Sequence, residues 1–321
     1  MKTPLKDLVR QRNKTREFHF FDKEHEIDAH LNYLHEAVSS NLGEQIFRQQ
    51  VSQHHENISV ELAKIRLLVN QQLQIFEQEI RAQDDEYFER SQQIYDGTIF
   101  DEPDYVMGRN KGHHFLKSQD GNVRELFLSR LGQYNDWRKP GLQIHPTFGK
   151  ITDYIKGCDP LYLLDTSNEL LMYVKTQFNE AYQKRLRYYT FNERANDPLH
   201  MIPKNQFGLI VVADWFNYKT MQMIVKYLKH FLDLLCDGGV VVFTYNNCDL
   251  PEAVERVDNG FQTYIPGQLL QEIVSELGYE IIKFIDAGGT ASWAEIKKPG
   301  EIETVRGGQT LAEIRSFVQN P

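Results

Sequence analysis

The chain has 321 residues, of which 41% are hydrophobic and 25% are charged, and both fractions lie in the globular range. Its formal net charge is −9, so the field of the whole molecule does not favour nucleic acid as a partner. No apolar run approaches the roughly 18 residues of a membrane span, and the amino terminus lacks the apolar core of a secretory signal. The length predicts about two domains. Three widely spaced cysteines exclude a disulfide scaffold and suit a reducing compartment, so we expect a cytoplasmic protein.

Residues 1–22 are predicted to form a basic amino-terminal arm. The first 16 residues carry six basic side chains and only one acid, Asp7. The simplest interpretation of such a charge run is a solvated terminal arm. The alternative is an arm that docks on an acidic partner or on nucleic acid.

Residues 23–95 are predicted to be a helical, coiled-coil-like region. Apolar residues recur in it at alternating spacings of four and three, which places them on one helical face. A helix over 44–94 would be about 75 Å long, and its narrow apolar stripe needs a partner. The first helix, the second domain and another copy of the chain all fit, so a homo-oligomer or a virion partner bound through 24–94 is one expectation. The stripe consists of Ile58, Leu62, Ile65, Val69, Leu73, Phe76 and Ile80.

No metal site is expected in this helical region. Metal ligands on a helix usually lie three or four residues apart, and the five histidines of the region mostly do not. We therefore interpret them as surface or boundary residues. They are His25, His30, His35, His54 and His55.

A glycine-rich linker over 96–121 leads to an α/β domain over 122–297. Short β-rich segments alternate there with helical stretches, which predicts a mostly parallel sheet with helices on both faces. The segments FGLIVVAD and VVVFTY are apolar throughout, as expected for strands buried on both faces. The predicted strands cover 141–145, 161–165, 185–191, 207–214, 240–245, 279–286 and 292–297, and the predicted helices cover 123–137, 149–156, 167–182, 219–235 and 266–277.

The last two predicted strands are joined by the short link Gly288-Gly289-Thr290. Such a link connects antiparallel neighbours, because a parallel crossover needs about a dozen residues. A mostly parallel sheet that ends in an antiparallel hairpin is typical of class I S-adenosylmethionine (SAM) methyltransferases, and it argues against a nicotinamide-binding Rossmann domain. The tail over 298–321 is open to packing on either domain or on a partner.

The α/β domain resembles the class I SAM methyltransferase family. LLDTSNELL resembles the family's second-strand acid and following helix, FGLIVVADWFNY its fourth strand, and HFLDLLCDGGVVVFTYNN its fifth. The carboxyl-terminal part also resembles uncharacterised methyltransferase-like proteins of tailed phages that infect marine cyanobacteria. The resemblance implies a Rossmann-like seven-stranded fold, SAM as the cofactor, an unknown methyl acceptor, and a location in the host cytoplasm or the virion.

The loop after the first strand departs from the family pattern. The pattern is an acid followed by glycines at every second position, and this chain instead has Gln143, His145, Thr147 and Gly149. Glycine permits a positive φ and lets a ligand approach without a Cβ. His145 therefore places an imidazole where the methionine part of SAM would pass, and Thr147 adds a β-branched side chain. Gln143 keeps its hydrogen-bonding capacity without the negative charge.

The resemblance also implies cofactor contacts after the second and third strands, since ligands bind beyond the carboxyl ends of parallel strands. Asp165 is expected to accept both ribose hydroxyls, with Thr166 beside it. The alternative is that Asp165 caps the next helix together with Thr166 and Ser167. Asn192 is expected either to contact the adenine edge or to be a turn residue.

Asp214, after the fourth strand, is the expected cofactor contact and the first candidate for a general base. His145 is the second candidate for that base, which is needed only where the acceptor must lose a proton. The alternative for Asp214 is that it merely closes the strand. The predicted substrate contacts are Trp215, Asn217, Tyr245 and Asn246.

Two functions follow from these observations. The first is a SAM-dependent methyltransferase with an altered cofactor loop, favoured by the fold pattern and by Asp165. The second is a catalytically inactive methyltransferase-fold scaffold whose amino-terminal helices drive assembly, for instance in a virion. The degenerate glycine loop and the long apolar stripe favour this second function.

Overall fold

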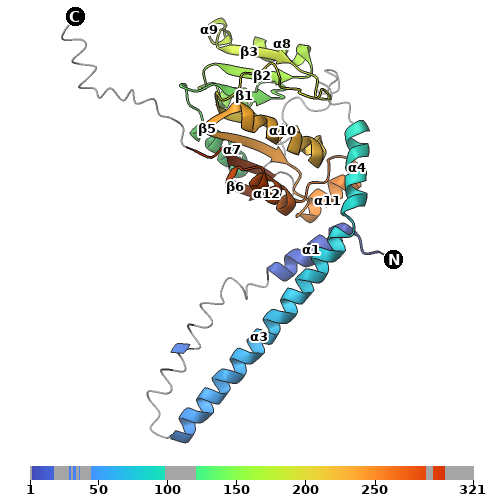
Figure 1. The fold of residues 1–321 in the computed structure, drawn as a ribbon, viewed down its shortest axis with the longest axis vertical. Helices are drawn as coiled ribbons and strands as arrows, with labels where there is room; N and C mark the ends of the chain where they lie inside the picture. The colour runs from blue at the N-terminus through green and yellow to red at the C-terminus, as the bar shows by residue number, and fades with distance from the viewer. Residues whose placement is uncertain are drawn as a thin grey trace, which may run out of the picture. The chain divides into compact units, whose positions relative to one another are not determined.

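The computed structural model describes residues 2–17, 45–97, 121–286 and 292–300, and residues 29, 32, 33 and 36 between them. It divides into two compact units, Met1–Glu86 and Tyr87–Pro321 (Figure 1). Most of the predicted linker, the link over 288–290 and the tail beyond residue 300 lie outside the described residues. In the described part of the chain, no helix is long and apolar enough to cross a membrane.

The first unit pairs helix α1 (Leu5–Arg16) with the long helix α3 (Gln45–Arg81). Leu5, Leu8 and Val9 of α1 lie on one helical face and are buried. The prediction of a solvated basic arm is therefore wrong for residues 5–16. That prediction weighed the charges and overlooked the apolar spacing of three and four between them.

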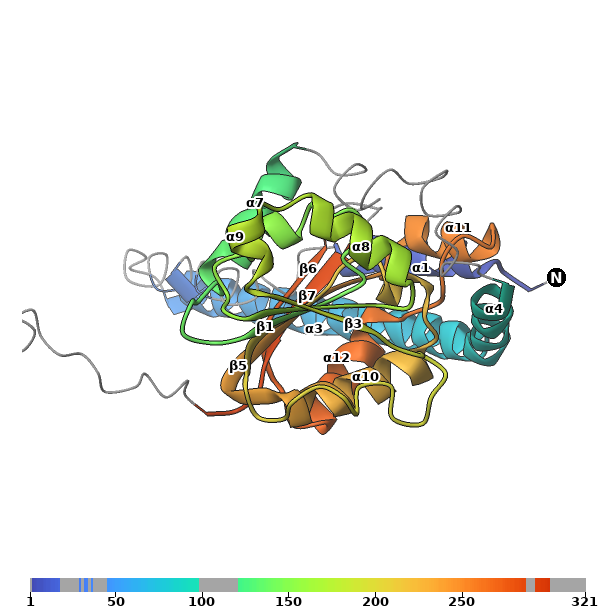
Figure 2. The same cartoon turned by 90° about the horizontal axis from the view of Figure 1, so that it is seen from above.

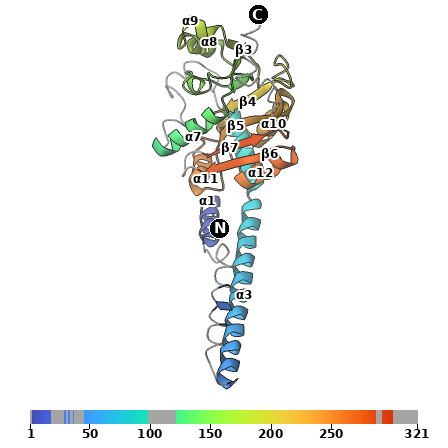
Figure 3. The ribbon, with the colours of Figure 1, turned by 90° about the vertical axis from the view of Figure 1, so that its left-hand side faces the viewer.

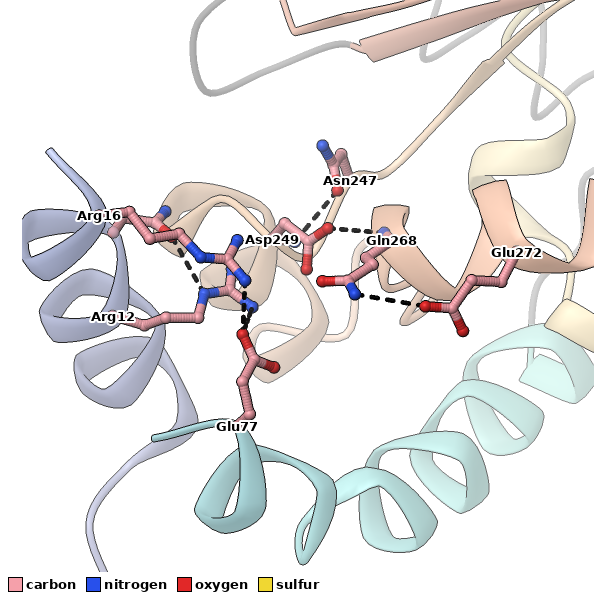
Figure 4. A network of polar contacts seen from close by, with 8 residues as sticks. Arg12, Arg16, Glu77, Asn247, Asp249, Gln268 and Glu272 are labelled. Carbon is pink, nitrogen blue, oxygen red and sulfur yellow. Dashed lines mark hydrogen bonds and ion pairs between the residues drawn. The ribbon is translucent and has the colours of Figure 1, made fainter. Parts of the chain in front are cut away.

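Two arginines of α1 make ion pairs with one acid of α3 (Figure 4). Arg16 lies 2.6 Å and Arg12 3.6 Å from Oε1 of Glu77. Arg12 is almost fully buried, so its charge needs this partner inside the helix pair. Part of the basic run therefore serves to dock α1 on α3.

The predicted single helix over 44–94 is interrupted. Helix α3 ends at Arg81, and α4 (Asp84–Gly97) begins after two turn residues, Ala82 and Gln83. Three acids in the first turn of α4, Asp84, Asp85 and Glu86, favour a new helix start there because they interact with the amino-terminal end of the helix dipole. The boundary between the two units falls inside α4, so most of α4 belongs to the second unit.

The second unit is built on one seven-stranded sheet in the order β3-β2-β1-β4-β5-β7-β6. β7 runs antiparallel to both of its neighbours, and the other pairs are parallel. The predicted mostly parallel sheet with an antiparallel carboxyl-terminal hairpin is confirmed. The strands are β1 (Gly141–Ile144), β2 (Leu161–Asp165), β3 (Leu186–Thr190), β4 (Phe207–Val212), β5 (Leu235–Tyr245), β6 (Glu280–Asp286) and β7 (Ser292–Lys297).

Helices cover both faces of the sheet (Figure 2). One apolar core lies between the sheet and α10 and α12, and a second lies between the sheet and α7 and α8. In Figure 3, α12 runs beside the edge strand β6. The helices are α7 (Gly121–Gln133), α8 (Asn168–Thr176), α9 (Glu180–Gln183), α10 (Met221–Leu234), α11 (Pro251–Asp258) and α12 (Gly267–Glu276), with 3₁₀ turns η1 (Thr152–Tyr154) and η2 (Phe216–Tyr218).

Two predicted helices differ from the structure, and one observed helix was not predicted. The helix expected over 149–156 is only the 3₁₀ turn η1, and the one expected over 167–182 divides into α8 and α9. The division occurs where the side chain of Asn179 accepts a hydrogen bond from the backbone of Tyr182 and so starts a new helix. Helix α11, which begins with Pro251 in its first turn, was not predicted.

A buried polar cluster fastens α7 to β7. The Glu295 carboxylate on β7 is fully buried and accepts hydrogen bonds from Arg130, the Tyr134 hydroxyl at 2.5 Å and the Trp293 indole at 3.0 Å. Burial alone would raise the pKa of Glu295, but these donors outweigh it and hold that pKa below its usual value. Burial and the bond to Glu295 raise the pKa of Tyr134 to about 12.

Candidate functional site

The loop after β1 takes a left-handed backbone conformation at every second residue. The φ angles are 56° at His145, 48° at Thr147 and 75° at Gly149. These are the three positions at which the methyltransferase pattern has glycine. A left-handed conformation costs a non-glycine residue about 1–3 kcal/mol, and the surrounding structure must hold it in place. The loop therefore keeps the backbone shape of the glycine pattern with two of its three glycines replaced.

The side chain of His145 contacts Asp165, the acid that is predicted to bind ribose. Nδ1 of His145 is 3.2 Å from Oδ2 of Asp165, and the two side chains are 5% and 0% exposed. The backbone N–H of His145 donates to the carbonyl of Leu164, which fixes the loop to the end of β2. The other carboxylate oxygen, Oδ1, accepts from the backbone N–H of Ser167 at 3.0 Å. Ser167, after Thr166, is itself the N-cap of α8, so Asp165 supports the cap without being it.

Three buried polar atoms around this loop have no hydrogen-bond partner among the described residues. They are Nε2 of Gln143, Oγ1 of Thr147 and Oδ2 of Asp165. The amide oxygen of Gln143 is used, because it accepts from the Thr152 hydroxyl at 2.7 Å. Buried polar atoms are seldom left unsatisfied, so three in one place indicate a site for the polar groups of a ligand or for water.

Asp214, just after β4, also has a positive φ, of 55°. Its backbone N–H donates to Oγ1 of Thr244 at 2.8 Å, and that hydroxyl donates to Oδ1 of Asn217, also at 2.8 Å. Thr263 in turn donates twice to the backbone carbonyl of Asn217. These buried contacts hold the strained backbone of Asp214 at the carboxyl edge of the sheet.

Two predicted substrate contacts, Trp215 and Tyr245, lie in the apolar core. Trp215 packs against Phe191 and Tyr227, and Tyr245 packs against Phe284. Burial raises the pKa of the Tyr245 hydroxyl well above its usual value. Both side chains are almost completely inaccessible, so in this conformation they pack the core and do not line a surface.

The other two predicted substrate contacts are also buried. Asn217 belongs to the hydrogen-bonded support of Asp214. The amide of Asn246 donates to the carbonyls of Ala253 and Thr263, at 3.1 and 3.0 Å, and thereby ties α11 to the end of β5. These residues were predicted because each follows the end of a strand. That position is shared by side chains that contact a ligand and by side chains that fasten the following loop.

Polar contacts also fix the loops around these positions. The exposed Asn192 accepts the backbone N–H of Arg194 at 3.0 Å, which is the turn geometry of the alternative prediction. After β5, the side chain of Asn247 accepts a hydrogen bond from the backbone N–H of Asp249 (Figure 4). The Asp249 carboxylate in turn accepts one from the backbone N–H of Gln268 in the first turn of α12. The carboxyl edge is therefore ordered from β3 to β5.

A buried ion pair that the sequence analysis missed lies at the same edge. Oε2 of Glu193 is 2.5 Å from Nζ of Lys219, and the hydroxyl of Tyr95 on α4 donates to Oε1 of Glu193 at 3.0 Å. The Lys219 ammonium also lies 4.6 Å from the ring centre of Trp215 and 5.2 Å from that of Tyr95. Burial and the Glu193 charge raise the pKa of Tyr95 to about 12. The only signal in the sequence was two opposite charges shortly after two predicted strands that are consecutive in the chain.

Comparisons with known proteins bear on the fold. No protein-family model and no curated protein matches the chain. A chain in the complex between the Haloferax volcanii Trm112 methyltransferase activator and the putative methyltransferase is similar at 12% identity, with 63% of this chain and 100% of that chain covered and a TM-score of 0.50. At that identity the likeness bears on the fold alone. The chain has a class I methyltransferase fold.

Other similar solved structures have lower TM-scores. The N-methyltransferase NodS from Bradyrhizobium japonicum WM9 in complex with S-adenosyl-l-homocysteine is 18% identical, with 58% of this chain and 92% of that chain covered and a TM-score of 0.45. A SAM-dependent methyltransferase from Aquifex aeolicus is 14% identical, with coverages of 61% and 98% and a TM-score of 0.45.

Proposed function

We propose that the second unit binds SAM at the carboxyl edge of its sheet and is a SAM-dependent methyltransferase. The observation that carries the proposal is the loop after β1. Its backbone is left-handed at every second residue, and three buried polar atoms without a hydrogen-bond partner among the described residues surround it. A loop of this shape beside a buried carboxylate offers hydrogen-bonding groups to a ligand that carries hydroxyl and amino groups.

The residues present fit SAM after one side-chain movement. Oδ2 of Asp165 makes no hydrogen bond in the described residues and can accept ribose hydroxyls once the His145 ring 3.2 Å away has moved, and Gln143 offers an unused amide donor. Thr147 and Gly149 keep the backbone geometry that lets a ligand approach. His145 must rotate away, because its imidazole now lies against Asp165.

When bound, SAM would supply a sulfonium methyl group that the nucleophilic acceptor takes by in-line displacement, with S-adenosylhomocysteine as the leaving group. Such a reaction asks mainly for positioning and for exclusion of water. Asp165 and the loop after β1 bind and orient, and the buried surroundings exclude water. Where the acceptor carries a proton, the Asp214 carboxylate takes it as general base, with His145 as the second candidate. Thr244 and Asn217 hold the backbone of Asp214 for that role.

Calorimetric titration of the full chain with SAM and with S-adenosylhomocysteine tests this proposal. We expect binding of both ligands and a loss of at least tenfold in affinity for Asp165→Ala. The matched control is Asp153→Ala, since Asp153 is an exposed acid of the same unit that pairs only on the surface with Lys156. The proposal is wrong if neither ligand binds the wild-type chain at millimolar concentration.

One observation favours a second function, a methyltransferase-fold scaffold that does not bind the cofactor. The ribose acid Asp165 is completely buried, and His145 occupies the space against it. On this proposal the first unit drives assembly, through apolar residues of α3 that are exposed, such as Ile65 at 42% and Leu68 at 63%. Light scattering then shows an oligomer that Leu68→Lys dissociates, and the titration with S-adenosylhomocysteine gives no heat.

A further inference from the structure

The ion pair between Glu193 and Lys219 bridges two loops that start far apart in the sheet. Glu193 lies three residues after β3 ends, and Lys219 lies seven residues after β4 ends. β2 and β1 separate these strands, so the loops converge across about 14 Å at a strand spacing of about 4.8 Å. The intervening strands end at Asp165 and immediately before His145. The ion pair therefore spans the part of the edge at which the candidate site lies.

Two of the three polar groups in this cluster are on anchored segments. The backbone carbonyl of Lys219 accepts from the Thr263 hydroxyl at 2.8 Å, which fixes the loop after β4. Helix α4, which carries Tyr95, is fixed by two bonds from Tyr87 and Arg90 to Asp258, at 2.8 and 2.7 Å. The third member, Glu193, lies on the loop after β3. Residues 192 and 194 on either side of it are exposed and share a turn hydrogen bond, and the Ala195 carbonyl accepts from Lys226 at 2.6 Å. Because its two neighbours are exposed, Glu193 is the member that we expect to move when the cluster opens.

The energetics of a buried ion pair suit an element that opens and closes. The side chains of Lys219 and Glu193 are only 4% and 8% exposed, so closing the pair removes both charges from water. Desolvation then offsets much of the attraction between them, and opening returns both ions to water. The two states therefore differ little in free energy as long as both charges are present. Removing one charge leaves the other buried without a partner and favours the open state.

We propose that Tyr95, Glu193 and Lys219 form a clasp that controls ligand entry to the site at Asp165. The clasp in the described conformation is closed, with Trp215 packed under the Lys219 ammonium. A ligand enters when the Glu193 loop moves away from Lys219 and Tyr95. The proposed function is needed here only for the identity of the ligand, and the clasp has a test of its own.

Fluorescence quenching of Trp215 by acrylamide reports the clasp without any ligand. The background variant is Trp137→Phe, because Trp137 is 73% exposed and would dominate the signal, whereas Trp293 is fully buried. In that background Lys219→Met leaves Glu193 without its cation, so we expect the Trp215 quenching constant to rise at least twofold. The double variant Glu193→Gln with Lys219→Met has no stranded charge and is expected to return toward the background value.

Stopped-flow binding of S-adenosylhomocysteine gives the second readout. Lys219→Met is expected to bind at least threefold faster than the background chain, and Tyr95→Phe, which removes only a hydroxyl, is expected to lie between them. Tyr95→Phe is also the variant to use if Lys219→Met does not fold. The clasp is wrong if quenching and association rate stay unchanged in the folded variants. Increased quenching in a chain that binds no S-adenosylhomocysteine keeps the clasp and overturns the proposed function.

Discussion

Nδ1 of His145 lies 3.2 Å from Oδ2 of Asp165, at the end of neighbouring parallel strands. The residue that replaces the first glycine of the loop therefore contacts the acid expected to bind ribose. His145 also holds the left-handed φ that the glycine pattern would provide. One substitution thus keeps the backbone of the site and covers its carboxylate, which makes His145 the residue whose replacement separates the two proposed functions.

His145→Gly is expected to raise the affinity for S-adenosylhomocysteine about tenfold. Glycine keeps the left-handed backbone without strain and uncovers Asp165, so no side chain must move before binding. The control is Thr147→Gly, which relaxes the same kind of strain at the same loop and leaves His145 in place. Calorimetry that finds equal affinities for the wild-type chain and His145→Gly would contradict the covering role.

The sheet was predictable from the sequence because its strands carry strong and independent signals. β4 and the second half of β5 are continuous apolar runs, and the short link before β7 forces an antiparallel turn. β5 begins five residues earlier than predicted, since its first part contains Asp237 and Gly238, which do not read as strand. The strand patterns were therefore sufficient to predict the topology of the sheet but not the residues at which the strands begin and end.

The candidate site was less predictable, because polar residues after a strand serve either a ligand or the following loop. Asp165 and the alternating positions of the first loop could be placed by strand order. Trp215 and Asn217 also follow the end of a strand, but both are buried: Trp215 packs in the apolar core and Asn217 accepts a hydrogen bond from Thr244. The clasp pairs residues 26 apart in sequence, Glu193 and Lys219, and only the fold brings them together.

Glu295→Gln is expected to destabilise the second unit by about 3 kcal/mol at pH 7, because it breaks a buried ion pair and leaves Arg130 without its partner. The pKa of Glu295 is lower in the folded chain than its ordinary value of 4.5. Its stabilisation is therefore fully present above that ordinary value and is lost as the pH falls through the lower folded value. Urea unfolding at pH 7 and at pH 3.5 is expected to show a smaller difference at the lower pH.

The control for that measurement is Glu280→Gln. Glu280 pairs with Lys297 across the β6–β7 edge at 2.7 Å, but both side chains are partly exposed. Exposed pairs contribute about 0–1 kcal/mol, so this variant is expected to change stability little. Equal effects of the two substitutions would mean that the Glu295 cluster does not fasten α7 to the sheet.

Leu8→Ala is expected to cost the first unit about 2–4 kcal/mol, since Leu8 is buried on the inner face of α1 and its removal leaves a cavity. Arg10→Ala is the control, because Arg10 is half exposed and pairs only with Asp7 on the same helix. Hydrogen exchange of the full chain, followed on α1 and on the part of α3 around Glu77, measures the effect. Unchanged exchange in Leu8→Ala would restore the solvated-arm prediction.

Thr244→Val is expected to destabilise the second unit by about 1–3 kcal/mol although it keeps the shape of the side chain. The hydroxyl of Thr244 accepts from the backbone of Asp214 and donates to Asn217, so valine leaves a buried donor and a buried acceptor without this partner. Thr244→Ser keeps the hydroxyl and loses only a methyl group, so it is expected to cost about 1 kcal/mol. Urea unfolding of both variants checks the order. If serine destabilises the chain more than valine does, packing of the methyl group and not the hydrogen-bonded support of Asp214 is what position 244 provides.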